Sequence, residues 1–146
     1  MEFLNPVFAV IAALGFAFVF KVPKNMLSMV AVLAFSGYFV RFVCFGLGMG
    51  IELSVLCGAL VIGVLGSLAA KKRDILPHTV TLASGIPMIP GSIVFDAIKY
   101  LISFVSAPKA DFMLLTQATY FASKSIFIIA ALAFGLTASH IIFKKS

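Results

Sequence analysis

Apolar runs close to the length of a membrane-spanning helix follow one another along almost the whole chain. In hydrocarbon each backbone N–H and C=O needs a partner within the protein, so irregular segments do not face lipid. A helix needs about twenty mostly apolar residues to cross a bilayer. With 62% hydrophobic and 11% charged residues and a mean hydropathy of +1.18, the chain predicts an all-α polytopic membrane protein.

Short polar segments divide the chain into about five predicted spans within a single transmembrane domain, residues 1–146. The spans cover about residues 3–20, 26–47, 51–70, 79–106 and 112–143. The last run is so long that it must tilt, bend or protrude. Gly46, Gly48 and Gly50 predict the turn between the second and third spans.

The charged residues predict which side of the membrane each loop occupies. Seven of the eleven Lys and Arg residues fall on the side with the loops after the first and third spans and the C-terminus: Lys21, Lys24, Lys71, Lys72, Arg73, Lys144 and Lys145. The opposite side holds one basic residue, Lys109, together with the acidic residues Glu2, Glu52 and Asp111. Because basic loops remain in the cytoplasm, we predict the N-terminus outside and the C-terminus inside.

Small residues recur at helical spacing in three of the predicted spans. The rows are Ala9, Ala13 and Ala17; Ala59, Gly63 and Ser67; and Ala131, Gly135 and Ser139. Such rows let helix backbones approach closely. They predict packing within the chain, with a contact to a partner subunit as the alternative for any one row.

The fourth span carries its own interruption, at Pro87–Pro90. Each proline lacks a backbone N–H and disfavours helix in the residue before it, and Gly91 and Ser92 follow directly. We therefore predict two helices that meet at the prolines. The second helix would present unpaired N–H groups and its positive dipole end, as discontinuous helices of secondary transporters do toward substrate carboxylates. The alternative is a proline kink that binds nothing.

Four ionisable side chains lie inside the predicted spans, and such residues are functional candidates by default. Asp96 and Lys99 are three residues apart on one helix face and can pair. By the rise of a helix, these two, Arg41 and Lys124 are expected roughly 12–18 Å from the outer boundary. The alternative is that the long cationic side chains snorkel to the headgroups. The candidate substrate-binding or coupling residues are therefore Pro87, Pro90, Gly91, Ser92, Asp96, Lys99, Arg41 and Lys124.

No pattern in the sequence supports a metal, a cofactor or catalysis. Cys44 and Cys57 lie in separate apolar runs without a Cys-x-x-Cys motif, which favours buried apolar roles over a disulfide or a metal site. The chain holds no HExxH, no GxSxG and no pair of carboxylates within the spans. Its net charge of +6 reports membrane orientation. We predict a protein that is not an enzyme and binds neither a cofactor nor nucleic acid.

The stretch "RDILPHTVTLASGIPMIPGSIVFDAIKY", with "IPMIPGS" at Ile86–Ser92, resembles the threonine/serine exporter family. That family has a basic loop after its third span, then a proline, then a Pro-Gly-x-x-Pro-x-x-Pro-Gly-like stretch. The likeness covers nearly the whole chain and departs at Ser84-Gly85, where the family often has Pro-Gly. The chain is most similar to the smaller, C-terminal five-span half of such transporters.

The resemblance implies a subunit of a secondary-active exporter in a bacterial inner membrane, driven by the proton gradient. Its substrates would be small hydrophilic metabolites, such as threonine and serine or small dicarboxylates. It implies a partner, a second subunit with a soluble N-terminal domain and about five spans, and a homo-oligomer is the other expectation. Two such halves of opposite orientation would form an inverted repeat. The alternative function is a passive pore or a structural assembly subunit without a substrate site.

Overall fold

The computed structural model describes residues 6–73, 77–107 and 111–143, and all regular elements in these ranges are helical. The α-helices are α1 (Pro6–Val19), α2 (Leu27–Gly46), α3 (Ile51–Arg73), α4 (Pro77–Gly85), α5 (Gly91–Ser106) and α6 (Phe112–Phe143). Two 3-10 turns accompany them, η1 (Lys24–Met26) before α2 and η2 (Ile86–Met88) after α4. The predicted all-α polytopic fold is confirmed.

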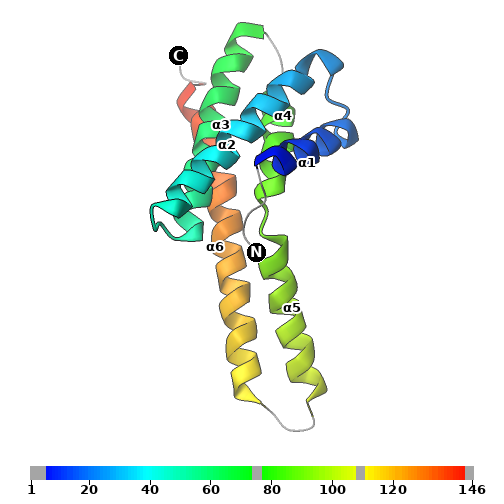
Figure 1. Cartoon of the computed structure of the whole chain (residues 1–146), viewed down its shortest axis with the longest axis vertical. Coiled ribbons are helices and arrows are strands. Elements are labelled where there is room, and N and C mark those ends of the chain that lie inside the picture. The colour runs from blue at the N-terminus through cyan, green and yellow to red at the C-terminus, as the bar shows by residue number, and fades with distance from the viewer. Residues whose placement is uncertain (1–5, 74–76, 108–110, 144–146) are drawn as a thin grey trace.

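Three helices in the described ranges are long and apolar enough to cross a membrane, namely Lys24–Gly46, Ile51–Ala69 and Phe112–Ala138. The bent pair formed by α4 with η2 and by α5 can make a fourth span. The predicted first span is a helix of 14 residues, about 21 Å long against a hydrocarbon core of ~30 Å. This short helix, α1, lies across α2 and α4 (Figure 1).

Two tight reversals set the ends of the first helices. α1 ends because Lys21 takes a left-handed backbone conformation, with φ of 53°. The N–H groups of Val22 and Lys21 then donate back to the carbonyls of Ala17 and Phe18, at 2.9 and 3.1 Å, in a Schellman arrangement. Between α2 and α3 the turn depends on Gly48, whose φ of 83° suits glycine. The glycine turn predicted at this point is confirmed.

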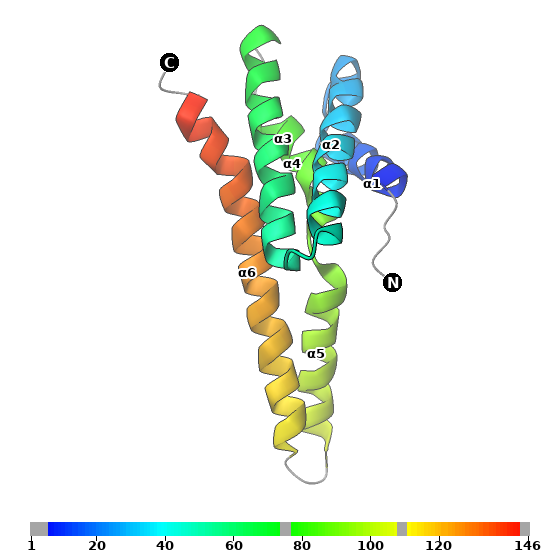
Figure 2. The ribbon, with the colours of Figure 1, turned by 60° about the vertical axis from the view of Figure 1, so that its left-hand side comes forward.

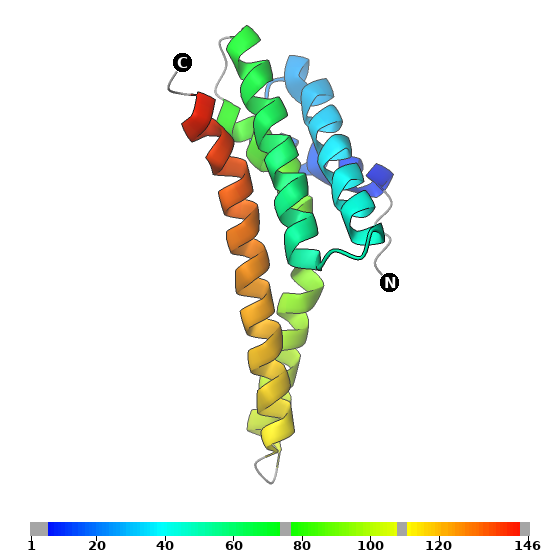
Figure 3. The same ribbon diagram turned by 90° about the vertical axis from the view of Figure 1, so that its left-hand side faces the viewer.

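The helices form two regions. α2, α3, α4 and the C-terminal half of α6 run side by side with α1 across them, and we call this region the bundle (Figures 1 and 2). α5 and the N-terminal half of α6, residues 112–127, continue past the turn between α2 and α3, and we call this region the hairpin (Figure 3). α6 belongs to both regions and joins them.

Close backbone contacts hold the bundle together. A Cβ atom on Gly58 of α3 would lie 2.6 Å from the carbonyl oxygen of Gly37 on α2. Since a real Cβ does not approach an oxygen so closely, a side chain at position 58 would push these two helices apart. α4 lies inside the same region, where the buried hydroxyl of Ser84 donates to the carbonyl of Val80 at 2.8 Å. This bond satisfies a polar group within its own helix.

The small-residue rows pack within the chain. Ala9, Ala13 and Ala17 are at most 1% exposed and belong to the core. On α6 a Cβ atom added to Gly135 would lie 2.6 Å from the Cβ of Ala59 on α3. These contacts support the packing interpretation of the rows, because the small residues face other helices of the same chain.

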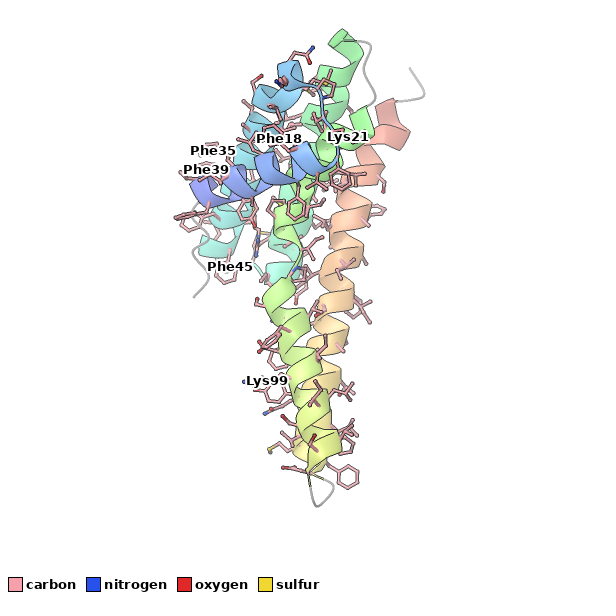
Figure 4. All side chains as sticks on the ribbon, turned by 90° about the vertical axis from the view of Figure 1, so that its right-hand side faces the viewer. Phe18, Lys21, Phe35, Phe39, Phe45 and Lys99 are labelled. Carbon is pink, nitrogen blue, oxygen red and sulfur yellow. The ribbon has the colours of Figure 1, made fainter. Side chains whose placement is uncertain are left out.

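Large apolar side chains cover the outside of both regions. Phe127 is 68% exposed and Phe39 is 51% exposed. Phe35 and Phe39 stack with their ring centroids 6.1 Å apart, and they and Phe45 point away from the bundle in Figure 4. A water-exposed surface rarely carries such wide apolar area. The surface is that of a multi-pass membrane protein, suited to acyl chains or to further membrane helices.

The predicted orientation depends partly on residues that the structure does not describe. Glu2, Lys109, Lys144 and Lys145 lie outside the described residues, as do the side chains of Lys71, Lys72, Arg73 and Ser139. An N-terminus outside and a C-terminus inside therefore stay a prediction.

Candidate functional site

The interruption of the fourth span lies where the prolines predict it. α4 ends at Gly85, η2 follows, and Ile89 takes an extended conformation with φ of −61° and ψ of 130°. Pro90 then caps α5, which begins at Gly91. The two helical segments are bent by 53° relative to each other. Because neither Pro87 nor Pro90 has an N–H to donate, an unbroken helix could not keep its full hydrogen-bond ladder here.

The interrupted segment is surrounded by other helices. Met88 is 1% exposed, and its methyl carbon lies beside Gly37 of α2 and Gly58 of α3. α1 also packs against η2. The hydroxyl of Tyr38 on α2 donates a hydrogen bond to the carbonyl of Pro87. Irregular backbone at membrane depth is tolerated where protein covers it, and the bundle provides that cover.

The N-terminus of α5 opens away from this cover. Gly91 and Ser92 are exposed, and a Cβ atom added to Gly91 would meet nothing within 4 Å. No side chain caps the helix, and its first turn holds no acidic residue. The first-turn N–H groups and the dipole of a 16-residue helix thus present positive potential beside open space.

Arg41 lies next to the interruption. Its guanidinium carbon is 5.4 Å from the ring centroid of Tyr38. Its Cβ is 3.3 Å from the position of a Cβ on Gly58, and the methyl carbon of Met88 is 3.2 Å from the same position. Arg41 and Met88 therefore flank one point on α3, which places a cation beside the break.

Asp96 and Lys99 lie farther along α5, on the hairpin. Asp96 is half-buried and Lys99 is exposed, and Figure 4 shows Lys99 pointing away from the helices. Among the side chains that the structure describes, these two make no ion pair. The Lys99 ammonium lies instead 6.0 Å from the ring centroid of Tyr100. The helical spacing allows a pair, but the lysine is turned toward the aromatic ring.

Lys124 belongs to a cluster of aromatic rings and lysines on the hairpin. Its ammonium lies 5.7 Å from the ring centroid of Tyr120. Tyr120 meets Phe121 edge to face at 5.4 Å, and Phe121 stacks on Tyr100 of α5 at 5.4 Å with the ring planes 4° apart. Three rings thus connect α5 to α6, with Lys99 and Lys124 at the two ends. Such cation–π contacts are strongest where water is excluded.

The candidate residues therefore fall into two groups and do not share one layer. Pro87, Pro90 and Arg41 lie at the break, where Gly91 and Ser92 open the next helix. The other group, Asp96, Lys99 and Lys124, lies on the hairpin, beyond the turn between α2 and α3 (Figures 2 and 3). The prediction that the four charged residues lie at one depth in the membrane assumed that all spans end at the same height on the outer side. The hairpin runs past that level, so Arg41 and Lys99 lie at different heights.

The comparisons with known proteins show the family of the chain. A sequence profile described as "Threonine/Serine exporter, ThrE" matches residues 5–142. The chain belongs to the threonine/serine exporter family. It is 32% identical over 138 residues to an uncharacterized protein of Haemophilus influenzae, and the match covers 94% of this chain and 46% of that relative. No solved structure matches the chain.

This chain thus spans about half the length of the curated relative that it matches. Its family is one of membrane transporters that act on small molecules, and the resemblance read from "IPMIPGS" is confirmed. No three His, Cys, Asp or Glu side chains in the described ranges gather as metal ligands would.

Sequence reasoning did not single out the tyrosines. The chain has three, and each lies under one of the three cations of its predicted spans. Tyr38 and Arg41 are three residues apart and Tyr120 and Lys124 are four apart, spacings that put side chains on one helix face. These tyrosine–cation spacings were visible in the sequence. The hydrogen bond from Tyr38 to Pro87 had no local signal, because 49 residues separate the two.

Proposed function

We propose that this chain is one half of a secondary-active exporter of small hydrophilic metabolites, either threonine- and serine-like amino acids or small dicarboxylates. The family match over residues 5–142 carries the proposal. The protein would work in a bacterial inner membrane and use the proton gradient. A relative about twice as long supports the need for a second half.

The break is the proposed substrate site. Pro87 and Pro90 interrupt the helix, and Gly91 and Ser92 leave the N-terminus of α5 free of bulk. A substrate carboxylate at this end would accept hydrogen bonds from first-turn N–H groups and gain from the helix dipole. Arg41 adds a full positive charge beside the break and can form a charge-assisted bond to the same anion.

Asp96 is the proposed proton-coupling residue. Of the acidic side chains it is the one that lies well inside a predicted span, since Glu52 stands at the very start of its own, and it is half-buried on α5. Protonation would remove its charge and so lower the cost of moving it through a dry environment. Lys99 and Lys124 lie over tyrosine rings near it on the hairpin. In the proposed cycle Lys99 leaves its ring to pair with Asp96 once the carboxylate has lost its proton.

The hairpin is the proposed contact surface for the second half. No residue of α5 is buried by this chain, although the helix carries Asp96 and Lys99. Charged residues within membrane spans almost always face protein or a wet cavity. A second five-span subunit with a soluble N-terminal domain would cover this face, and a second copy of the chain is the other possible occupant.

A flux assay tests the exporter proposal. Vesicles containing this chain and the second subunit are loaded with labelled threonine, serine or succinate, and efflux is followed under an imposed pH gradient. We expect gradient-driven efflux of one of these substrates, and Asp96→Asn should abolish its pH dependence. Glu52→Gln, at the start of α3, is the control carboxylate. Absence of flux with both subunits present would overturn the proposal.

The same assay separates the alternative. A passive pore would show efflux that ignores the pH gradient, and an assembly subunit would show none. In either case Asp96→Asn and Lys99→Ala would change nothing, whereas bulky residues in the small-residue rows would abolish assembly.

A further inference from the structure

The carbonyl of Pro87 is a backbone group that the break deprives of its helical partner. In an unbroken helix it would accept the N–H of Gly91, four residues on. That N–H donates instead to the carbonyl of Ile89 at 2.8 Å. The hydroxyl of Tyr38, which is 4% exposed, donates to the Pro87 carbonyl. A side chain of another helix thus supplies the hydrogen bond that the break removes.

The next residue, Met88, is seated between α2 and α3. Its methyl carbon lies 3.0 Å from the position of a Cβ on Gly37 and 3.2 Å from that of a Cβ on Gly58. Because both positions are glycine, the methionine tip fits where the two helices touch. Two consecutive residues of η2 are therefore held, one by a hydrogen bond and one by packing.

A longer polar contact also links α4 to α2, through the same hydroxyl that donates to Val80 within α4. The hydroxyl of Ser84 lies 3.3 Å from the carbonyl of Val30, two turns before Tyr38. α2 thus contacts the interrupted span at both Ser84 and Pro87, so α4 and η2 form one unit with it.

This hold ends at Ile89. The residue is extended and 46% exposed, and α5 packs on α6 through Tyr100 and Phe121. Within two residues the chain passes from a segment fixed in the bundle to a helix with no buried residue. Beyond η2 the cap residue Pro90 is buried as well, so η2 and this proline are the last fixed points before α5.

We propose that Tyr38 is a positioning residue, whose hydrogen bond to Pro87 sets the point and the direction at which α5 leaves the bundle. The inference depends on the proposed function in one respect, that the N-terminus of α5 receives the substrate carboxylate. Helix-terminus effects fall off within the first turn, so a displaced α5 loses the anion. The Tyr38 ring also lies under Arg41, and one side chain therefore places both the helix end and a cation.

Distance measurement between spin labels tests the positioning role. Labels are attached at Ile98→Cys on α5 and Leu68→Cys on α3, both exposed positions, in a background carrying Cys44→Ser and Cys57→Ser. The labelled protein without a further substitution should give one narrow distance distribution between the two labels. Tyr38→Phe leaves a partly buried carbonyl without a partner, and we expect the ratio of displaced to native distances to rise about tenfold.

Ser36→Ala is the matched control. Its hydroxyl, on the same helix, donates to the carbonyl of Leu33 at 3.0 Å, so its loss should not change the distribution. Met88→Leu is the second variant, useful if Tyr38→Phe does not fold, because it keeps the volume and alters only the tip between the glycines. It should give a smaller displaced population. Native distributions in both folded variants would overturn the role of Tyr38.

A transport measurement adds a readout that a loss of stability would not produce. In folded Tyr38→Phe protein with its second subunit, the KM for substrate should rise about tenfold, with little change in maximal rate, since substrate binding is affected first. An unchanged KM contradicts the link between Tyr38 and the substrate. If even the unsubstituted protein transports nothing, the proposed function fails, and the spin-label distances still decide whether Tyr38 holds the break.

Discussion

The bundle and the hairpin are built from one helix-forming chain but are held together in different ways. In the bundle, glycine and alanine bring backbones into contact, as at Gly58 and Gly37 or Gly135 and Ala59. In the hairpin, α5 has no buried residue and meets α6 through stacked rings, Tyr100 on Phe121. The bundle helices each pack against several others, whereas α5 packs mainly on α6, and its side chains therefore stay partly exposed. The bundle thus has a buried core within this chain, and α5 contributes no buried residue.

Truncating one isoleucine in each region should give the largest contrast. Ile62 of α3 is 0% exposed, and Ile102 of α5 is 60% exposed. Ile62→Ala leaves a cavity and should cost about 2–5 kcal/mol. Ile102→Ala should change stability by less than about 0.5 kcal/mol. Thermal unfolding in detergent, followed by circular dichroism, measures both, and equal losses would mean that the hairpin is as tightly packed as the bundle.

Adding one methyl group to the bundle should have the next largest effect. Gly58→Ala puts a carbon where the carbonyl oxygen of Gly37 lies 2.6 Å away, and a backbone atom cannot turn aside. The expected loss is about 1–3 kcal/mol. Gly15→Ala on α1, where nothing lies within 4 Å, is the control and should be neutral or slightly stabilising because alanine favours helix. Similar melting of the two variants would refute the close contact.

Removing the ring at the centre of the aromatic cluster should loosen the hairpin alone. Phe121→Ala deletes contacts to Tyr100 and Tyr120 that are worth about 0.5–1.5 kcal/mol beyond simple burial. Hydrogen exchange should speed up in α5 while exchange in α2 and α3 stays unchanged. Phe127→Ala, which removes an exposed ring, is the comparison. Faster exchange throughout the chain would show that the two regions unfold together.

The smallest effect is expected from the cation at the end of the cluster. Lys99→Gln removes an ammonium that lies over Tyr100, an interaction worth about 0.5–1 kcal/mol at an exposed site. Exchange in α5 should rise less than it does in Phe121→Ala. An effect larger than that of the ring deletion would mean that Lys99 has a stronger partner, such as Asp96, in the membrane.

Much of the fold could be predicted because its causes are local. Apolar runs require helices in hydrocarbon, and Pro87 and Pro90 end one helix and start another wherever the rest of the chain lies. Gly48 marks a turn because its positive φ is a local property of glycine. The end of α4 and the start of α5 followed from the two prolines. The length of α1 did not, because Lys21 in a left-handed conformation is no ordinary stop signal.

The candidate site shows what a sequence leaves open. The sequence shows by itself that three cations, Arg41, Lys99 and Lys124, and one carboxylate, Asp96, lie within apolar segments. Tertiary structure alone decided their heights, because the hairpin extends past the turn between α2 and α3 (Figure 3). It also decided that Tyr38 reaches Pro87 across 49 residues. Backbone geometry and hydropathy act over a few residues and are written in the sequence, whereas the relative placement of helices results from the packing of all of them together.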